Sequence, residues 1–471
     1  MSPTPRPKPS RPSPLLARRS KSTAASLSAF IPSLPVRVRS PGPWTLTPGP
    51  CSSAPSTPTA SSTETTVADD LRSLYDRCIR CGLCLNACPT YRVLGEELDS
   101  PRGRIYQVAQ ADQGRIEIDA AFRLHMDRCL DCRACMTACP SGVNYGAIIE
   151  YTRAQLLEQQ PLKFWQRWLL HGLIPRPRRR RAAARLIRFA QRTGIDRLGP
   201  AQARLCPPLD ADPFAASGQV IPAEGERRAR VIFLPGCVQC ELLPQLNRAT
   251  VRVLARQGCD VVVPPAFGCC GALHVHAGDR AFARQLARSN IAALEAIPAD
   301  VVISNASGCG AQLKQYAELF DEDPAWRGRA AAFAARVQDA TEFLDHLGLR
   351  RDLLGPIPAV ATYQDACHLA HAQRIREAPR TLLRQIPQLE LREMERSDQC
   401  CGSAGIYNLQ QPAIAAQLAA DRVAAFRATG ACILATANPG CSLQLAAALP
   451  PPVQVLHVLE LLDLSHAAAR R

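Results

Sequence analysis

The sequence lacks any long apolar run and any recognisable nucleotide-binding fingerprint. No stretch of 18 consecutive apolar residues occurs in the 471-residue chain, so the sequence predicts no membrane-spanning helix. No G-x-G-x-x-G motif lies at a strand–helix junction, which excludes the common dinucleotide-binding loop. Without a flavin or nicotinamide of its own, the chain has no group that accepts a hydride. The apolar fraction of 47% and the chain length suit two or three globular domains.

Acidic residues are missing from residues 1–63, which are rich in Ser, Pro, Thr and Arg. Such a composition builds no core, so we expect residues 1–66 to be a disordered basic tail, in which Cys51 has no assigned role. Residues 1–70 hold 8 Lys and Arg against 3 acids, and residues 161–230 hold 15 against 5. These two segments account for the whole net charge of +15, since the remaining residues have 33 of each sign. The charge is therefore local, and without a recognised motif we expect no nucleic-acid binding.

The chain is rich in cysteine, with 21 residues. Residues 78–89 read C-I-R-C-G-L-C-L-N-A-C-P and residues 129–140 read C-L-D-C-R-A-C-M-T-A-C-P. Both runs follow C-x2-C-x2-C-x3-C-P, the bacterial spacing for a cubane [4Fe–4S] cluster. A disulfide framework is disfavoured because no secretory signal is evident, and zinc sites usually pair two C-x2-C units across a longer gap. The two runs predict two [4Fe–4S] clusters, a reducing compartment and a role in electron transfer.

The fourth cysteine of each run is expected to serve the other cluster, as in two-cluster ferredoxins. Cluster I is therefore assigned to Cys78, Cys81, Cys84 and Cys139, and cluster II to Cys129, Cys132, Cys135 and Cys88. This exchange ties the two loops together and sets the clusters close enough for electron hopping.

We expect an α+β multidomain protein whose residues 67–150 form a mainly helical, ferredoxin-like two-cluster domain. Helices are predicted for the segment that enters the first loop, from Pro101 onward, from Ala120 to Arg128 and over residues 145–160. A helical basic linker follows at residues 151–228. Its tryptophans beside a run of arginines suit a membrane interface or, in the preferred interpretation, a hairpin packed on the body with solvated arginines.

Residues 229–471 contain an internal repeat, which the cysteines reveal. Both halves contain the sequence C-C-G, with one cysteine 32 or 33 positions before the pair and another 39 or 40 positions after it. The first set is Cys237, Cys269, Cys270 and Cys309, and the second is Cys367, Cys400, Cys401 and Cys441. Repetition over a long period indicates duplicated units. We therefore expect two α/β CCG units, at residues 229–350 and 351–471.

Short apolar runs alternate with helical patterns in both units, which predicts parallel α/β layering. Strands are predicted at Arg230–Leu234, Val261–Val263, Val301–Ile303, Val360–Tyr363, Ile433–Ala435 and Val453–Val458. Helices are predicted at Leu242–Arg256, Asp279–Ala296 and Ala311–Phe320. The cysteines fall at strand ends and helix starts. Open α/β sheets place ligands there, and a helix N-terminus favours an anionic group.

The chemistry of the two CCG sets stays open on the sequence. Adjacent cysteines can bridge two irons of one cluster, which favours an additional iron–sulfur cluster in one or both units. A redox-active dithiol or disulfide is the second interpretation, and structural zinc or bare thiols are the third. Nearby histidines are expected to be hydrogen-bond partners or core residues rather than ligands; they are His274, His276, His368 and His371. Cys240 is a candidate fifth ligand of the first set, and Cys206, Cys259 and Cys432 are expected to be buried fillers.

A twin ferredoxin domain followed by two CCG domains resembles the iron–sulfur subunits of heterodisulfide reductases, anaerobic glycerol-3-phosphate dehydrogenase and 2-hydroxy acid oxidases, above all glycolate oxidase. The resemblance covers about residues 70–465. It is carried by C-P-T-Y-R-V-L-G-E-E-L-D-S-P-R-G-R-I-Y at 88–106, D-R-C-L-D-C-R-A-C-M-T-A-C-P-S-G-V at 127–143, D-A-C-H-L-A-H at 365–371 and C-C-G-S-A-G-I-Y-N at 400–408. The fullest CCG motif of the heterodisulfide reductases ends in C-x2-C. Here Gln312 and Gln444 replace the last cysteine, which disfavours heterodisulfide chemistry.

The resemblance implies an oxidoreductase subunit that is not catalytic alone. Partner subunits that bind FAD would oxidise glycolate to glyoxylate, and this chain would pass the electrons to a quinone or another membrane acceptor. The implied location is cytoplasmic, with peripheral contact at the inner face of the cell membrane. The alternatives are a subunit of a lactate or glycerol-3-phosphate dehydrogenase, a heterodisulfide-type thiol oxidoreductase, and an assembly scaffold.

Overall fold

The computed structural model describes residues 67–195, 206–214 and 218–470, and the tail predicted at residues 1–66 lies outside them. The first part of the described chain is helical. Its elements are α1 (Val67–Tyr75), α2 (Cys84–Ala87), α3 (Pro89–Leu94), η1 (Glu97–Asp99), α4 (Pro101–Asp112), α5 (Ala120–Asp127), α6 (Ala134–Thr137) and α7 (Tyr145–Gln159). The four predicted helices are confirmed as α1, α4, α5 and α7.

Side-chain caps explain where three of these helices begin. Ser100, Asp119 and Asn144 each accept a hydrogen bond from a backbone N–H in the first turn of α4, α5 and α7. The helices enclose a small core in which Met126, Ile148 and Ile149 are almost fully buried. This core is the support for the two cysteine loops, because α2 and α6 have four residues each and carry no core of their own.

The linker segment packs on the rest of the protein through few side chains. It contains α8 (Phe164–Arg167), the π-helical turn η2 (Trp168–Leu173) and α9 (Pro177–Thr193). Leu170 and Ile174 are buried against Cys237 and Cys269 of the first CCG unit, whereas α8 and α9 contain no buried residue. The preferred interpretation of a packed hairpin therefore holds for η2, whereas α9 contacts η2 and α10 without burying any residue fully.

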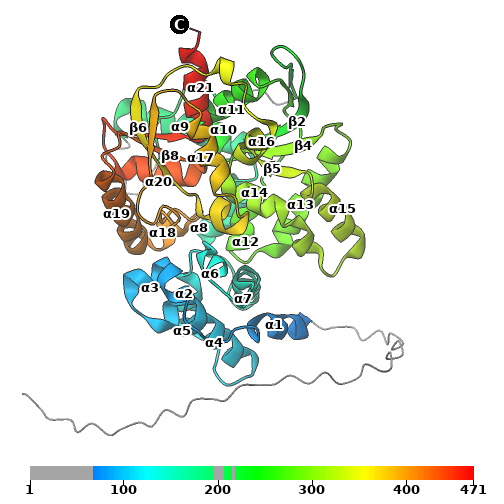
Figure 1. The fold of residues 1–471 in the computed structure, drawn as a ribbon. Helices are drawn as coiled ribbons and strands as arrows, with labels where there is room; N and C mark the ends of the chain where they lie inside the picture. The colour runs from blue at the N-terminus through cyan, green and yellow to red at the C-terminus, as the bar shows by residue number, and fades with distance from the viewer. Residues whose placement is uncertain (1–66, 196–205, 215–217, 471) are drawn as a thin grey trace, which may run out of the picture. The chain divides into compact units, whose positions relative to one another are not determined.

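The first CCG unit is built on a five-stranded sheet with the order β1-β3-β2-β4-β5. Figure 1 labels β2, β4 and β5 of this sheet. The strands are β1 (Val220–Ile221), β2 (Ala229–Leu234), β3 (Cys259–Val262), β4 (Val301–Ser304) and β5 (Val337–Asp339). All neighbours are parallel except β1, which runs antiparallel to β3. The helices are α10 (Gln239–Leu242), α11 (Pro244–Arg256), α12 (Ala272–His276), α13 (Arg280–Glu295), α14 (Ser307–Lys314), η5 (Tyr316–Phe320), α15 (Pro324–Ala334) and α16 (Ala340–Leu347).

The second CCG unit repeats this topology with four parallel strands in the order β7-β6-β8-β9. The strands are β6 (Ala359–Gln364), β7 (Leu389–Arg392), β8 (Ile433–Thr436) and β9 (Gln454–His457). The helices are η6 (Arg351–Leu353), η7 (His368–Ala372), α17 (Glu377–Arg384), α18 (Tyr407–Gln410), α19 (Pro412–Ala428), α20 (Pro439–Ala448) and α21 (Val458–Ala468). The order matches β3-β2-β4-β5 of the first unit, which supports the duplication read from the cysteines.

Both faces of the first sheet are covered, as the continuous apolar sequence of β2 requires. Val231 and Phe233 point into one hydrophobic cluster, and their neighbours Ile232 and Leu234 point into another. The first cluster also contains Tyr363 of β6, so the two units share one core. Among the described residues no helix is long and apolar enough to cross a bilayer.

Candidate metal centres

The cysteines of the two ferredoxin-type runs line two adjacent cavities. One is lined by the four sulfurs assigned to cluster I, Cys78, Cys81, Cys84 and Cys139. The other is lined by the four assigned to cluster II, Cys88, Cys129, Cys132 and Cys135. Cys135 borders both cavities, so the two sites are neighbours. The residues therefore fit two clusters with exchanged fourth ligands, and the ligand assignment stays a prediction that this placement supports.

Both loops follow the same unusual backbone path. The residue before the second cysteine is left-handed in each, Arg80 with a φ of 57° and Asp131 with a φ of 50°. The residue after that cysteine is left-handed too, Gly82 in the first loop and Arg133 in the second. A left-handed non-glycine residue costs on the order of 1–2 kcal/mol, so the surroundings must enforce it. The repeated path indicates that both loops are shaped to surround the same kind of group.

The sulfurs of the second cavity are buried and hydrogen-bonded. Burial raises the pKa of the Cys132 and Cys135 thiols well above the ordinary value, and in the first cavity burial raises the pKa of Cys84 to about 11. A bound cation would have to supply the charge that makes these thiols ionise. The Cys129 sulfur accepts a hydrogen bond from the Asp131 N–H at 3.3 Å and one from the Tyr145 hydroxyl at 3.5 Å. Such bonds to sulfur are among the interactions that tune a cluster.

A group of buried charged residues lies beside the second cavity, and the sequence did not predict it. Arg104 lines that cavity and is almost fully buried. Its guanidinium pairs with Asp99 at 3.2 Å and donates to the Thr90 hydroxyl at 3.2 Å, and Asp99 also accepts from Arg128 at 2.8 Å. The P-R-G-R sequence of the resemblance contained Arg104, but nothing in its spacing pointed to burial.

The two CCG sets are each brought together by the fold. In the first, the Cys270 and Cys309 sulfurs lie 3.2 Å apart, and hydrogen bonds between sulfurs connect Cys237 to Cys269 and Cys269 to Cys270. The second set has the same order of sulfur contacts, Cys367 to Cys400 to Cys401 to Cys441. All eight cysteines line a single cavity of about 400 Å³.

The C-C-G sequence suits these sites for a steric reason. Gly271 and Gly402 have φ values of 88° and 89°, a conformation that other residues rarely adopt. A Cβ atom on Gly402 would lie 2.6 Å from the Ala415 carbonyl oxygen, so the position also requires the absence of a side chain. Cys309 and Cys441 occupy the first turns of α14 and α20, where the helix dipole favours a thiolate.

The two CCG sets differ in their electrostatics. Hydrogen bonds from the Cys367 and Cys401 thiols hold the pKa of Cys400 well below its ordinary value. In the first set a thiol hydrogen bond with Cys237 lowers the pKa of Cys269, but the contact with Cys270 and burial outweigh it and raise the value to about 12. These contacts therefore favour a thiolate at Cys400 of the second set and a neutral thiol at Cys269 of the first.

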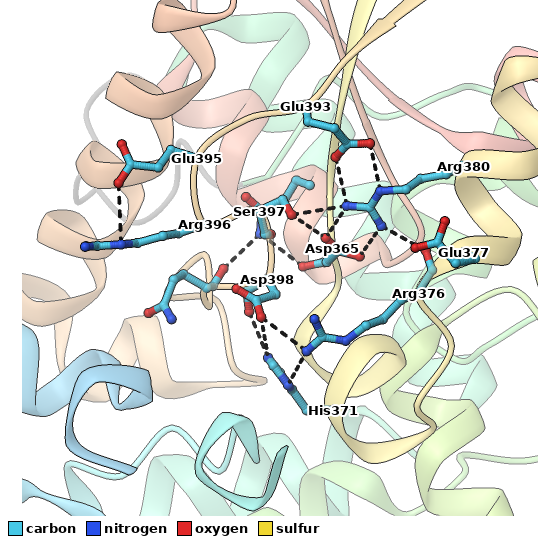
Figure 2. A network of polar contacts seen from close by, with 12 residues as sticks. Asp365, His371, Arg376, Glu377, Arg380, Glu393, Glu395, Arg396, Ser397 and Asp398 are labelled. Atoms are coloured by element: carbon cyan, nitrogen blue, oxygen red, sulfur yellow. Dashed lines mark hydrogen bonds and ion pairs between the residues drawn. The ribbon is translucent and has the colours of Figure 1, made fainter. Parts of the chain in front are cut away.

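A buried ionic clamp holds the loops that carry the second set (Figure 2). The Arg380 guanidinium donates to both carboxylate oxygens of Asp365, at 2.8 and 2.7 Å, and also pairs with Glu393 at 2.9 Å. The Ser397 hydroxyl donates to Asp365 at 2.6 Å. Asp365 lies two residues before Cys367, and Ser397 lies three before Cys400. The clamp therefore fixes two sulfur-bearing loops relative to each other.

All four histidines near the motifs have hydrogen-bond partners. His371 contacts the Thr137 hydroxyl at 2.9 Å and the Asp398 carbonyl at 3.0 Å, which joins the clamp of Figure 2 to the ferredoxin-type domain. His274 contacts the Leu170 carbonyl at 2.8 Å, and His276 contacts Asp131 at 2.8 Å. The His368 ring nitrogen lies 3.7 Å from the Cys367 sulfur.

The second CCG set lies directly against the second ferredoxin-type cavity. Cys132 and Cys400 belong to one buried cluster with Leu130 and Tyr407, and Cys367 packs against it. The Tyr407 hydroxyl donates to the Arg128 carbonyl at 2.9 Å. The order of sulfur sites is therefore the first cavity, the second cavity, and then the second CCG set.

The first CCG unit meets the ferredoxin-type domain through a buried group of charges. Donor atoms of Asp131, Glu150 and His276 lie within 4.8 Å of one another, close enough to hold a metal ion. However, the Arg133 guanidinium contacts Glu150 and lies 3.5 Å from Asp131, so it already supplies the positive charge. Arg133 also donates to the side chain of Gln315 at 2.6 Å. We interpret this group as an interdomain ion-pair cluster.

Two of the remaining cysteines depart from the sequence expectations. Cys432 was expected to be buried but is exposed, because it lies just before the first residue of β8, outside the paired part of that inner strand. The Cys206 side chain is half-buried and lines the large cavity, whereas Cys259 is fully buried in β3 as expected. The Cys240 sulfur lies 3.5 Å from the Pro235 carbonyl and does not line the cavity of the CCG sets.

Comparisons with known proteins agree with this arrangement. The profile of the 4Fe–4S dicluster domain matches residues 75–143, and that of the cysteine-rich CCG domain matches residues 231–314 and 361–446. The profile of the linker region of glycolate oxidase iron–sulfur subunits matches residues 161–199.

Two curated relatives are similar over most of the chain, and a third over about half of it. The chain is 38% identical to the "Probable glycolate oxidase iron-sulfur subunit" of Bacillus subtilis, over 82% of this chain and 92% of the relative. It is 35% identical to the glycolate oxidase iron–sulfur subunit of Escherichia coli, over 83% and 94%. A lactate utilization protein A of Bacillus pumilus is 31% identical over 48% of this chain and 96% of the relative. On these matches the chain belongs to the family of glycolate oxidase iron–sulfur subunits.

Proposed function

We propose that this chain is the electron-transfer subunit of a complex that oxidises glycolate to glyoxylate. Partner subunits that bind FAD would carry out the oxidation, and this chain would deliver the electrons to a quinone or another membrane acceptor. When bound, [4Fe–4S] clusters supply one-electron transfer, which suits a flavin donor. Cys78, Cys81, Cys84 and Cys139 would hold one cluster, and Cys129, Cys132, Cys135 and Cys88 the other.

The observation that carries this proposal is the continuous series of sulfur sites. Cys135 borders both ferredoxin-type cavities, and Cys132 shares a buried cluster with Cys400 of the second CCG set. At the other end of the series Cys81 is exposed, beside the exposed side chains of Ile79 and Leu83. A redox partner can therefore approach the first cavity closely, while the later sites are shielded from water.

Lactate oxidation is the second candidate function. The similarity to lactate utilization protein A covers nearly the whole of that relative. The described residues of this chain supply no hydroxy-acid site that would decide between the substrates, so the choice depends on the partner subunit. Reduction by glycolate or by lactate in the assembled complex separates the two.

The test uses the chain purified anaerobically, alone and with its co-expressed flavin subunits. We expect at least about eight iron atoms per chain and a paramagnetic signal after dithionite. Glycolate should produce the same signal only when the flavin subunits are present. Reduction of the isolated chain by glycolate would contradict the proposal, and so would colourless, iron-free protein.

A matched pair of cysteine variants checks the ligand assignment. Cys84→Ser should lose about four iron atoms and one paramagnetic signal, because Cys84 is one of the sulfurs of the first cavity. Cys432→Ser removes an exposed cysteine outside all four sets and should keep the full iron content. Equal iron in the two variants would show that the assignment is wrong. Cys400→Ser then reports whether iron above about eight atoms resides in the second CCG set.

A further inference from the structure

Two helices of the linker expose large apolar side chains that have no cover among the described residues. On α8 and the turn that follows, Phe164 is 85% exposed and Trp168 is 54% exposed. On α9, Leu186 is 70% exposed and Phe189 is 62% exposed. Single exposed apolar residues are common, but large ones gathered in one short segment mark an interaction surface.

The exposed residues of α9 form one face of the helix. Ala182, Leu186 and Phe189 are spaced by four and three residues, so they lie on one stripe. Arg178, Arg185 and Arg192 are spaced by seven residues and form a parallel stripe next to it. The side chains of all six residues are exposed. The outward face of α9 therefore combines an apolar stripe with a row of cations.

Five of the seven arginines of α9 divide into two groups. Arg180 donates to the Ile174 carbonyl, and Arg188 donates to the Asp210 and Ala211 carbonyls at 3.0 and 2.8 Å. These two turn inward and attach the helix to its own chain. Within the part of the chain that the structure describes, Arg178, Arg185 and Arg192 have no hydrogen-bond or ion-pair partner. They are cations available to an external ligand, and Arg185 also lines a cavity that it shares with Arg188, Asp210 and Glu241.

Trp168 of the preceding turn adjoins this face. A Cβ atom on Gly172 would lie 3.7 Å from the Trp168 ring and 3.5 Å from the Arg179 guanidinium. Arg179 also donates to the Gly172 carbonyl at 3.0 Å. Since Arg179 and Leu186 are seven residues apart, Trp168 lies near the N-terminal end of the face that Leu186 extends.

The charge of the segment identifies the kind of partner. Residues 161–194 contain ten Lys and Arg and no Asp or Glu. A surface of this composition attracts anions, and residues 1–66, with eight basic residues and one acid, do not complement it. Arginines flanking a Leu and Phe stripe, with tryptophans close by, match helices that lie in the interface of an anionic bilayer.

We propose that the exposed face of α9, with Phe164 and Trp168, docks on an anionic phospholipid bilayer. Leu186 and Phe189 would enter the boundary between headgroups and acyl chains, while Arg178, Arg185 and Arg192 would contact the phosphates. Docking would bring the chain to the membrane acceptor of the proposed function. Only this biological purpose rests on the proposed function; the docking itself rests on the exposed face of α9.

The test measures binding of the anaerobically purified full chain to lipid vesicles by flotation. We expect binding to phosphatidylcholine vesicles that contain phosphatidylglycerol, and little binding to pure phosphatidylcholine. High salt should weaken the binding because the charges are exposed. Leu186→Gln and Phe189→Gln should each weaken it about tenfold, and Arg185→Gln and Arg192→Gln each about fivefold.

Matched controls remove the same side chains elsewhere. Leu464→Gln changes a half-exposed leucine of α21, and Arg427→Gln changes an exposed arginine of α19. Both should bind vesicles like the unchanged chain. Iron content and the dithionite-reduced signal should be normal in every variant, so a failure of electron transfer is distinguishable from a failure of docking.

Two results would overturn the proposal. One is equal binding to neutral and anionic vesicles, or binding that the α9 variants leave unchanged. The other is loss of co-purification with the flavin subunits in Leu186→Gln and Phe189→Gln while vesicle binding persists. That outcome would assign the face to a protein partner instead of a membrane.

Discussion

Single buried residues set limits on the conditions under which the protein is stable. His457 ends β9 and caps α21, where its imidazole accepts a hydrogen bond from the Leu459 N–H at 3.1 Å. Burial disfavours the imidazolium and lowers the pKa of His457 to about 4, from an ordinary value of 6.5. The neutral ring is therefore part of the folded structure, whereas the unfolded chain binds a proton more readily.

This histidine makes folding sensitive to acid. Because its folded pKa lies below its unfolded pKa, its contribution is fully present above pH 6.5 and is lost as the pH falls toward about 4. His457→Asn keeps a side-chain cap and removes the titration. Between about pH 7.5 and about pH 5, the unchanged chain should lose roughly 2 kcal/mol more unfolding free energy than the variant. Denaturant unfolding of both proteins at the two pH values measures the difference, and equal losses would contradict the assignment.

At the scale of the elements, loops at strand ends carry the chemistry and need support from buried ion pairs. The clamp of Asp365, Arg380 and Ser397 joins the loop after β6 to the loop before Cys400 (Figure 2). The first unit has an amide network instead, in which Asn305 of the loop after β4 donates to Asn247 at 3.2 Å and accepts from Gln239 at 2.9 Å. The duplicated topology is therefore stabilised by different side chains in its two copies.

Breaking the clamp should release the second sulfur set. Asp365→Asn leaves the Arg380 guanidinium without its bidentate partner, which we expect to cost about 2 kcal/mol or more. The Cys400 and Cys401 thiols should then be alkylated faster under anaerobic conditions, as measured by mass spectrometry of the modified peptides. Asp352→Asn changes an exposed aspartate and serves as the control. Unchanged labelling in Asp365→Asn would mean that the loops are held by other contacts.

At the scale of the whole molecule, the ferredoxin-type domain is tied to both CCG units by contacts of its cysteine loops. Asp131 and Arg133 bind the first unit through His276 and Gln315. Leu130 and Cys132 pack against the second unit. The second cysteine loop, which would hold a cluster, therefore also makes contacts between the domains.

Removal of iron should loosen these contacts before it affects the sheets. Metal binding supplies folding energy to loops that have little structure without it. After chelation under anaerobic conditions, amide protection measured by hydrogen exchange should fall in residues 78–88 and 129–140. Strands β2 and β6 should keep their protection, because they lie in the shared apolar core. Uniform loss of protection across the chain would contradict this division.

The sequence predicted those features that depend on local spacing. The cysteine sets could be read from their intervals, and β2, β4, β6 and β8 from continuous apolar runs. Strand β7 (Leu389–Arg392) could not be recognised, because its Leu-Glu-Leu-Arg sequence alternates at an edge of the sheet. The sequence also could not predict that both CCG sets line a single cavity, because this depends on how the two units pack.

The charged partners were missed for a related reason. His276 and Asp131 are 145 residues apart, and Arg133 and Gln315 are 182 apart. Periodicity within one segment of the sequence cannot predict a contact between residues so far apart in the chain. Arg104 stood in a recognised motif, yet its burial depends on the packing of α4 against Asp99 and Thr90.

The left-handed residues of the cysteine loops have a consequence for how the second loop is stabilised. Glycine at the positions of Asp131 and Arg133 would make the second loop easier to form but would remove the side chains that grip the first CCG unit. The free-energy cost of the left-handed residues can be offset by the binding energy of a cofactor. The cofactor and the first CCG unit would then stabilise the same loop from its two sides, so that loss of either would weaken the hold of the other.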